Sequence, residues 1–226
     1  MRIVAGAWRG RTLVAPPGQG TRPTADRVRQ ALFDMLMHAE WGGRQAIEGA
    51  AVLDVFAGTG ALGLEALSRG AATACFIESD PAALKALRAN VAACRAEDRT
   101  RVLGGDVFTT VSRPGLGRPS KNYATGGGKV VGGRTKSGHD TGGMGVIQPS
   151  SLVFLDPPYG RGLIPRAIAH LLRTGHIAPV ALIIAETGQD ESWLPDQPLL
   201  ADRRHGAARM LAFRAPEDCN QVRHLS

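Results

Sequence analysis

Short runs of apolar residues alternate along the chain with longer segments in which apolar residues recur every three or four positions. The short runs predict β-strands and the longer segments predict helices. Strands are expected at 51–56, 74–79, 101–106, 151–156, 181–187, 199–205 and 208–214, the last two forming a hairpin around Gly206. Helices are expected in "ALGLEALSRG", "PAALKALRANVAAC" and "LIPRAIAHLLRTG". Seven strands joined by helical crossovers predict a doubly wound α/β sheet.

The first 40 residues precede this sheet and have a pattern of their own. "RIVAGAWRGRTL" alternates weakly and predicts a short β-hairpin, and "APPGQGTRP" predicts a loop. "TADRVRQALFDMLMHA" places its apolar residues on one helical face, with Thr24 as the expected N-cap. We therefore expect an N-terminal hairpin and helix in 1–40, a sheet domain in 41–215 and a tail in 216–226.

Residues 112–150 break the pattern, since they contain eleven glycines and almost no apolar periodicity where a crossover helix is expected. A long segment of this kind inside a compact domain is typical of a functional or disordered insertion. We interpret it as a flexible, basic, solvent-exposed insertion. Its "GGGK" lacks the GxxxxGK[ST] spacing of a phosphate-binding loop.

Composition and charge narrow the class of protein. No apolar run approaches the roughly 18 residues of a membrane span, and the N-terminus lacks the apolar region of a secretory signal. The three cysteines form neither a CxxC pair nor a metal-binding spacing, so we expect a cytoplasmic protein with reduced thiols and no bound metal. Of the net charge of +7, segments 1–30 and 112–150 each carry +5, which leaves the rest mildly acidic. Basic segments around a neutral or acidic pocket favour a polyanionic partner such as nucleic acid.

A glycine-rich loop follows the first predicted strand of the sheet. Gly58, Gly60 and Gly63 match G-x-G-x-x-G, and Glu78 follows twenty residues after Gly58, as in a dinucleotide-binding site. However, Asp54 lies just before the loop, where a carboxylate would repel a pyrophosphate but suit the ammonium group of an amino-acid cofactor. S-adenosylmethionine therefore fits better than a dinucleotide.

Two further acids follow the next two predicted strands. Glu78 could accept hydrogen bonds from the ribose hydroxyls of this cofactor, and Asp106 could accept one from its adenine amino group. Each acid could instead be an ordinary cap or turn residue. Acids at the carboxyl ends of three successive strands are jointly harder to explain in that way.

The stretch "LVFLDPPYG" ends a predicted buried strand with an acid, two prolines and an aromatic residue. Proline cannot donate to a sheet ladder, so the strand must stop and a stiff turn follows. With the cofactor over the first three strands of the sheet, this turn lies beside the transferable methyl group. Asp156 and the Pro157 carbonyl can accept the two N–H bonds of a nucleobase amine, and the Tyr159 ring can stack on the base.

These residues resemble a known family. "DPPY" resembles the [DNS]-PP-[YFW] signature of amino-methyltransferases that act on adenine, guanine or glutamine amides. From Arg2 to about Arg214 the chain resembles the bacterial 16S rRNA (guanine(966)-N2)-methyltransferase family, of the RsmD type. The matching stretches are "RIVAGAWRGRTL", "RPTADRVRQALF", "LDVFAGTGALGLEALSRGA", "FIESD", "LVFLDPPYGRGL" and "RRHGAARMLAFR".

The resemblance implies a Rossmann-like, S-adenosylmethionine-dependent methyltransferase domain that methylates the N2 amine of a guanine in small-subunit rRNA. It implies that the substrate is the small ribosomal subunit or its assembly intermediate. The cofactor contacts implied are Asp54, Gly58, Gly60, Glu78 and Asp106, with Arg22 to Thr24 closing over them. The residues implied to handle the base are Asp156, Pro157 and Tyr159. For RNA binding we predict the basic N-terminus, with Arg2, Arg9, Arg11 and Arg22.

Two segments depart from the family pattern: the insertion 112–150 is longer and richer in glycine, and the tail matches nothing. Other functions remain open at this point. A DPPY turn serves adenine N6 as well as guanine N2, so an N6-adenine methyltransferase on DNA or RNA is the first alternative. A nicotinamide-dependent dehydrogenase and a non-catalytic RNA-binding protein are the others. We expect a monomer.

Overall fold

The computed structural model describes residues 1–16, 23–111 and 148–218, with the backbone alone at 23–25. Within these residues one seven-stranded sheet has the order β3-β2-β1-β4-β5-β7-β6. Strands β1 to β5 run parallel, whereas β7 pairs antiparallel with β5 and with β6. The strands are β1 (Ala51–Val55), β2 (Thr73–Glu78), β3 (Thr100–Gly104), β4 (Ser150–Leu155), β5 (Ile177–Gly188), β6 (Leu199–His205) and β7 (Ala208–Arg214).

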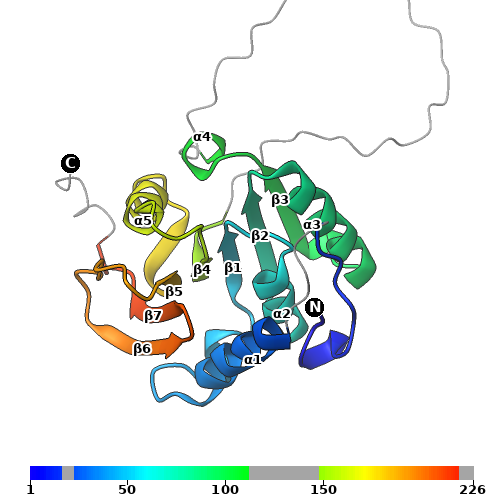
Figure 1. Ribbon diagram of the computed structural model, residues 1–226, viewed down its shortest axis with the longest axis horizontal. Coiled ribbons are helices and arrows are strands. Elements are labelled where there is room, and N and C mark those ends of the chain that lie inside the picture. The colour runs from blue at the N-terminus through cyan, green and yellow to red at the C-terminus, as the bar shows by residue number, and fades with distance from the viewer. Residues whose placement is uncertain (17–22, 112–147, 219–226) are drawn as a thin grey trace, which may run out of the picture.

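Helices pack on both faces of this sheet (Figure 1). They are α1 (Pro23–His38), α2 (Ala61–Ser68), α3 (Pro81–Cys94), α4 (Val107–Thr110) and α5 (Leu163–Arg173). Buried side chains of α1, α2 and α3 share one apolar cluster with the sheet, and those of α4 and α5 share the other. The predicted doubly wound sheet is therefore confirmed. No helix in the described part of the chain is long and apolar enough to span a membrane.

Most element bounds lie within one or two residues of the prediction, and two differ for identifiable reasons. β5 begins at Ile177 instead of 181, because its pairing with β4 continues past an irregularity in register. Val180 has a φ of 51° there, and the preceding Pro179 lacks an N–H, so the local sequence does not look like a strand. Helix α1 begins at Pro23, so the prediction that Thr24 is its N-cap is wrong.

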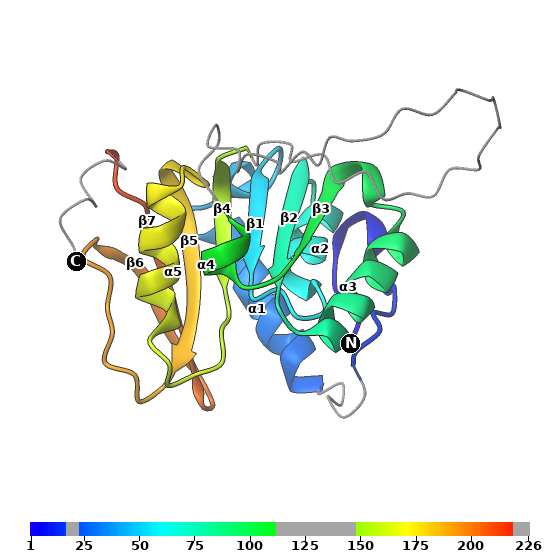
Figure 2. The same cartoon turned by 90° about the horizontal axis from the view of Figure 1, so that it is seen from above.

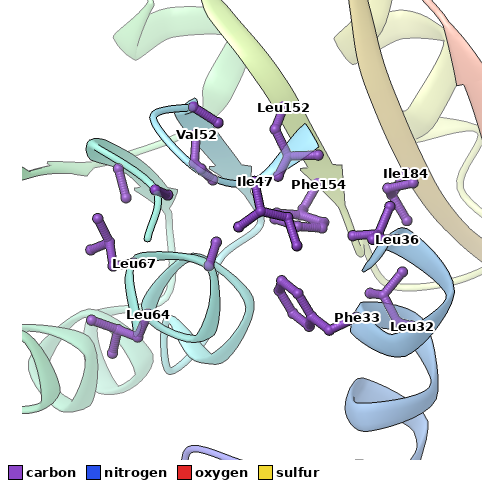
Figure 3. Close-up of a cluster of buried hydrophobic side chains, with 14 of the residues drawn as sticks. Leu32, Phe33, Leu36, Ile47, Val52, Leu64, Leu67, Leu152, Phe154 and Ile184 are labelled. Carbon is purple, nitrogen blue, oxygen red and sulfur yellow. The ribbon is translucent and has the colours of Figure 1, made fainter. Parts of the chain in front are cut away.

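Helix α1 fastens the N-terminal part of the chain to the central strands. Phe33 and Leu36 are fully buried and face Phe154 of β4 and Ile184 of β5 (Figure 3). The rings of Phe33 and Phe154 lie 5.7 Å apart, and the Arg69 guanidinium covers Phe33 at 4.8 Å. Each such side chain contributes about 1.5–3 kcal/mol on burial. The N-terminal helix thus shares its core with the strand that precedes the DPPY turn.

Residues 1–16 form an N-terminal arm beside α3 (Figures 1 and 2). The predicted hairpin is present as two short paired segments, neither of which is a regular strand. Antiparallel bonds join Ile3 N–H to the Arg11 carbonyl and Leu13 N–H to the Met1 carbonyl, both at 2.9 Å. A 3₁₀ turn, Gly6–Trp8, closes the loop between them. Ile3 and Leu13 are buried, so the arm contributes to the apolar cluster on this face.

Polar side chains of α2 hold the backbone of this arm. The fully buried Glu65 carboxylate accepts the N–H groups of Val4 at 2.8 Å and Ala5 at 3.0 Å. It also pairs with Arg69 at 2.8 Å and lies 3.7 Å from Arg29, which balances its charge. The two segments approach so closely that a Cβ at position 6 would lie 1.9 Å from the Ser68 carbonyl oxygen.

Helix α3 makes a further link between the arm and the body. Asn90 is fully buried, and its side-chain oxygen accepts the Val14 N–H at 2.7 Å. Its amide nitrogen donates to the carbonyls of Val14 at 3.0 Å and Thr59 at 2.9 Å. Because Thr59 belongs to the glycine-rich loop, Asn90 joins that loop to the end of the arm.

The predicted insertion 112–150 lies outside the described residues except at its end. Gln148 and Pro149 precede β4, and Ser150 is already its first residue, so the strand begins one residue earlier than predicted. The flexibility and exposure predicted for the remainder stay predictions. The same holds for most of the predicted tail, which is described only to 218.

Candidate functional site

A cavity of about 440 Å³ opens where the carboxyl ends of β1, β2 and β4 meet. Its walls come from the turn after β1, the junction of β2 with α3 and the turn after β4. The lining residues are Phe56, Gly58, 78–80, Ala83 and 156–159. Ligands of open α/β sheets bind at this edge, and the volume is within the usual range of small-molecule sites.

Two glycines of the glycine-rich stretch, Gly60 and Gly63, sit where a side chain would not fit. Gly60 precedes α2 with a φ of 77°, and a Cβ on it would lie 2.3 Å from Leu87. A Cβ on Gly63 would lie 2.4 Å from the Phe76 ring. Gly58 lines the cavity, whereas Gly60 is buried against Leu87 of α3 and Phe76 of β2. The predicted G-x-G-x-x-G therefore shapes the loop and packs α2 against β2.

Glu78 fastens this loop to the end of β2. Its carboxylate accepts the Gly58 N–H at 2.6 Å and the Asp80 N–H at 2.7 Å, and its side chain is 8% exposed. A carboxylate has about four acceptor positions, so capacity remains for a ligand hydroxyl. The Asp80 side chain in turn caps α3 by accepting the Ala83 N–H at 2.7 Å.

Asp54 lies directly beneath the loop and is 2% exposed. It accepts the Gly63 N–H of α2 at 2.9 Å. Burial raises the pKa of Asp54 to about 8, the Gly63 hydrogen bond opposes this, and the charges of Asp156 and Glu78 add to it. This environment favours the protonated form of the carboxyl. A cationic group placed nearby would favour its ionised form.

The DPPY turn follows β4 as predicted and forms the opposite wall. Pro157 is buried, whereas Asp156 and Tyr159 face solvent in the cavity. Desolvation by the surrounding walls raises the pKa of Asp156, and the charge of Glu186 raises it further. The Tyr159 hydroxyl donates to Glu186 at 2.5 Å, and the Gly160 N–H donates to Glu191 at 2.7 Å. Two acids at the end of β5 and just after it thus brace the turn.

The other predicted site residues lie outside the cavity lining or outside the described residues. Asp106 is exposed, lies outside the cavity lining and caps α4 by accepting the Phe108 N–H at 2.7 Å. Arg22 and the side chain of Thr24 lie outside the described residues. Arg2, Arg9 and Arg11 are exposed on the arm. The roles predicted for these residues stay predictions.

Among the described residues, several anchoring side chains escaped the sequence analysis, including Glu186, Glu191, Glu65 and Asn90. Glu186 could have been found, since it is an acid near the carboxyl end of a strand, the same signal that identified Asp54 and Glu78. Glu191 follows that strand in a loop without a motif. Glu65 and Asn90 sit on buried helical faces, where a polar residue signals a specific partner but does not say which one.

Comparison with known proteins places the chain in a definite context. A family model described as Conserved hypothetical protein 95 matches residues 1–123. Ribosomal RNA small subunit methyltransferase D of Escherichia coli K12 is 36% identical over 88% of this chain and 79% of its own length. The protein of the same name from Haemophilus influenzae is 33% identical over 84% of this chain and 80% of its length.

A solved structure has the same fold over nearly the whole chain. It is the structure of the protein yhhF from Escherichia coli and superimposes with a TM-score of 0.70 at 32% identity. The match covers 96% of this chain and 99% of that one. The arm, the sheet and the β6–β7 hairpin are therefore parts of one shared architecture.

Proposed function

The chain belongs to the ribosomal RNA small subunit methyltransferase D family, and from this premise we propose how its site methylates a guanine N2 amine in small-subunit rRNA. Membership makes the protein an S-adenosylmethionine-dependent rRNA methyltransferase. The choice of atom and the role of each residue are the proposal.

The charge of the cavity lining is the observation that carries this proposal. Among the described residues that line the cavity, Glu78, Asp80 and Asp156 are acids and none is basic. The sulfonium and ammonium groups of S-adenosylmethionine are cationic and suit such a lining, whereas the pyrophosphate of a nicotinamide dinucleotide would be repelled. The residues present therefore fit the methyl donor, and the dehydrogenase alternative is disfavoured.

The acids held in place by backbone N–H groups indicate how one half of the site, the cofactor half, binds S-adenosylmethionine. We assign the ribose hydroxyls to the remaining acceptor capacity of Glu78 and the ammonium end to the neighbourhood of Asp54. Asp106 is assigned to the adenine amino group through the carboxylate oxygen that does not cap α4. Gly58 and Gly60 let the backbone approach closely. Arg22 and Thr24 are proposed to close over this half.

The acceptor half follows from the DPPY turn. When bound, the cofactor supplies an electrophilic methyl group on sulfur. Asp156 and the Pro157 carbonyl accept the two N–H bonds of the guanine amine, which localises its lone pair toward that methyl group. Transfer of that methyl group to the amine would require the amine to lose a proton. The raised pKa of Asp156 suits it to take this proton. Tyr159 offers its ring as a stacking surface for the base.

The basic N-terminal region is proposed to hold the RNA. Arg2, Arg9 and Arg11 are exposed on an arm that Asn90 connects to the glycine-rich loop. Contacts from arginine to phosphate position an RNA without reading its sequence. We propose that 1–40 forms the RNA-binding part and 41–215 the catalytic part. The substrate proposed is the small ribosomal subunit or its assembly intermediate, bound by a monomer.

Methyl transfer to purified small subunits that lack the modification tests this function. The full-length protein is incubated with methyl-labelled S-adenosylmethionine, and the rRNA is digested to nucleosides for mass spectrometry. We expect N2-methylguanosine at one site, with no transfer to subunits that already carry it. Label appearing as N6-methyladenosine, or no label in the rRNA, would contradict the proposal.

A further inference from the structure

Glu186 has no role in the catalytic scheme above, although its carboxylate lies beside the reacting centre. β4 and β5 are parallel neighbours, and their register pairs Leu155 with Ala185. Asp156 and Glu186 are the next residues along, so they lie side by side at the carboxyl edge of the sheet. Their electrostatic coupling agrees with this placement, since the charge of Glu186 adds to desolvation in raising the pKa of Asp156.

Because of the strand order in the sheet, Glu186 lies on the side of the site away from the cofactor half. β1 and β2, which carry Asp54 and Glu78, lie on one side of β4, and β5 lies on the other. Neighbouring strands are about 4.8 Å apart, so Glu186 is about one strand spacing beyond Asp156. Glu186 is not among the residues that line the cavity, but a base whose amine is held at Asp156 and whose ring stacks on Tyr159 would extend toward it.

The contacts of Glu186 leave it able to bind a further donor. Its Oε1 accepts the Tyr159 hydroxyl at 2.5 Å, which fixes the carboxylate next to the ring proposed to stack on the base. This bond uses one of about four acceptor positions. The side chain is half-buried, so a hydrogen bond formed there is only partly exposed to water.

The chemistry of the two candidate bases differs at the ring atom next to the reacting amine. Guanine carries an N1–H donor beside its N2 amine, whereas adenine carries an unprotonated N1 acceptor beside its N6 amine. A carboxylate at this place attracts the first and repels the second. A site built to hydrogen-bond such a group rejects an analogue that lacks it by large factors.

We propose that Glu186 accepts the N1–H of the target guanine and thereby selects guanine over bases with an unprotonated N1. This inference rests on the proposed function and adds a specificity-determining residue to it. Asp156 and Pro157 then hold the amine, and Glu186 identifies the ring that bears it.

Replacing one atom group of the substrate tests this directly. Small-subunit particles are reconstituted from ligated rRNA with either guanine or 2-aminopurine at the methylated position. 2-Aminopurine keeps the 2-amine but has an unprotonated N1. We expect the wild-type protein to favour guanine by about 10²-fold in kcat/KM. In Glu186→Gln the amide can donate to N1, so the preference falls at least about 10-fold.

Glu191→Gln is the matched control. Glu191 braces the same turn by accepting the Gly160 N–H at 2.7 Å and the Gly188 N–H at 3.3 Å, so these bonds hold the backbone of the turn and not the Tyr159 hydroxyl. Its substitution should change kcat/KM for both particles by the same factor. Calorimetry with S-adenosylhomocysteine reports whether each variant is folded, and Glu186→Ala takes the place of Glu186→Gln if that variant is not. The alanine variant should also narrow the preference.

The outcomes separate this inference from the function beneath it. Equal losses on both particles in Glu186→Gln would mean that Glu186 only orients Tyr159, and would overturn the inference while leaving the function intact. A wild-type protein that methylates both particles equally would overturn it as well. A wild-type protein inactive on the guanine particle would overturn the proposed function itself.

Discussion

The two halves of the carboxyl edge of the sheet use their acids in opposite ways. On the β1–β2 side, Asp54 accepts a backbone N–H from Gly63, and Glu78 accepts two, from Gly58 and Asp80. On the β4–β5 side, Asp156 and Glu186 lie next to each other, and Glu186 is bonded to a side-chain hydroxyl. One half fixes its acids to the backbone, and the other sets two carboxylates side by side.

This difference matches the role proposed for each half. Acids fixed by backbone donors cost little to organise when a ligand binds, which suits a cofactor that occupies one pose. Neighbouring carboxylates hold protons more tightly, which suits a group that takes a proton from an amine during the reaction. The comparison therefore predicts that substitutions on the β4–β5 side lower turnover, whereas substitutions on the β1–β2 side lower cofactor affinity.

The largest effect is expected on the acceptor side. Asp156→Ala should lower turnover by about 10²–10³, or about 2.7–4 kcal/mol, because one aligned acceptor of the amine is lost. Calorimetry should find the affinity for S-adenosylhomocysteine unchanged. Asp202→Ala, which breaks an ion pair with Arg209 on the β6–β7 hairpin, is the control and should leave both quantities unchanged. If Asp156→Ala lost cofactor affinity in step with activity, the proposed division of roles between the two halves would be wrong.

The cofactor half as a whole can be probed by its ligand. S-adenosylhomocysteine at 100 times its Kd should stabilise the protein by about 2.7 kcal/mol. For a chain of this size the melting temperature should rise by about 5–10 °C in a thermal-shift measurement. NAD should give no shift, because the described residues of the lining include no basic partner for its pyrophosphate. A shift with NAD alone would assign the acids of this half to another ligand.

A substitution within the cofactor half should give the reverse of the Asp156 result. Glu78→Ala leaves the N–H groups of Gly58 and Asp80 without their partner and removes the proposed ribose contact. We expect S-adenosylhomocysteine to bind more weakly by about 1–3 kcal/mol, with turnover recovering at saturating cofactor. Titration calorimetry and initial rates measure the two quantities. A variant with normal cofactor affinity and low turnover would place Glu78 on the acceptor side.

The smallest effect concerns the proton on Asp54. Its folded pKa of about 8 exceeds the ordinary value of about 3.9, so its contribution to stability is present below pH 4 and is lost as pH rises to 8. An ammonium group bound nearby should lower that pKa. Cofactor binding at pH 7 should then release most of one proton, which calorimetry detects in buffers of different ionisation enthalpy. Asp54→Asn should release none, and an equal release from both proteins would remove Asp54 as its source.

Local sequence patterns determined much of this molecule. The bounds of β6, β7 and α3 agree with the prediction, because alternation, a turn glycine and a proline at the first turn act over a few residues. The acids at strand ends were visible for the same reason, since parallel strands deliver their carboxyl ends to one edge. That rule correctly brought Gly58, Glu78 and Asp156 to a single cavity.

What each of those residues contacts depends on how distant segments pack together. No local pattern could show that Glu78 binds Gly58, that Glu65 holds Val4 or that Asn90 joins the arm to Thr59, because these contacts span 20 to 76 residues. β5 was misjudged at its start because its pairing with β4 overrides a sequence interrupted by proline. The nearness of Glu186 to Asp156 likewise depends on strand order and register. A sequence sets which groups each strand offers, but the packing of distant segments selects their partners.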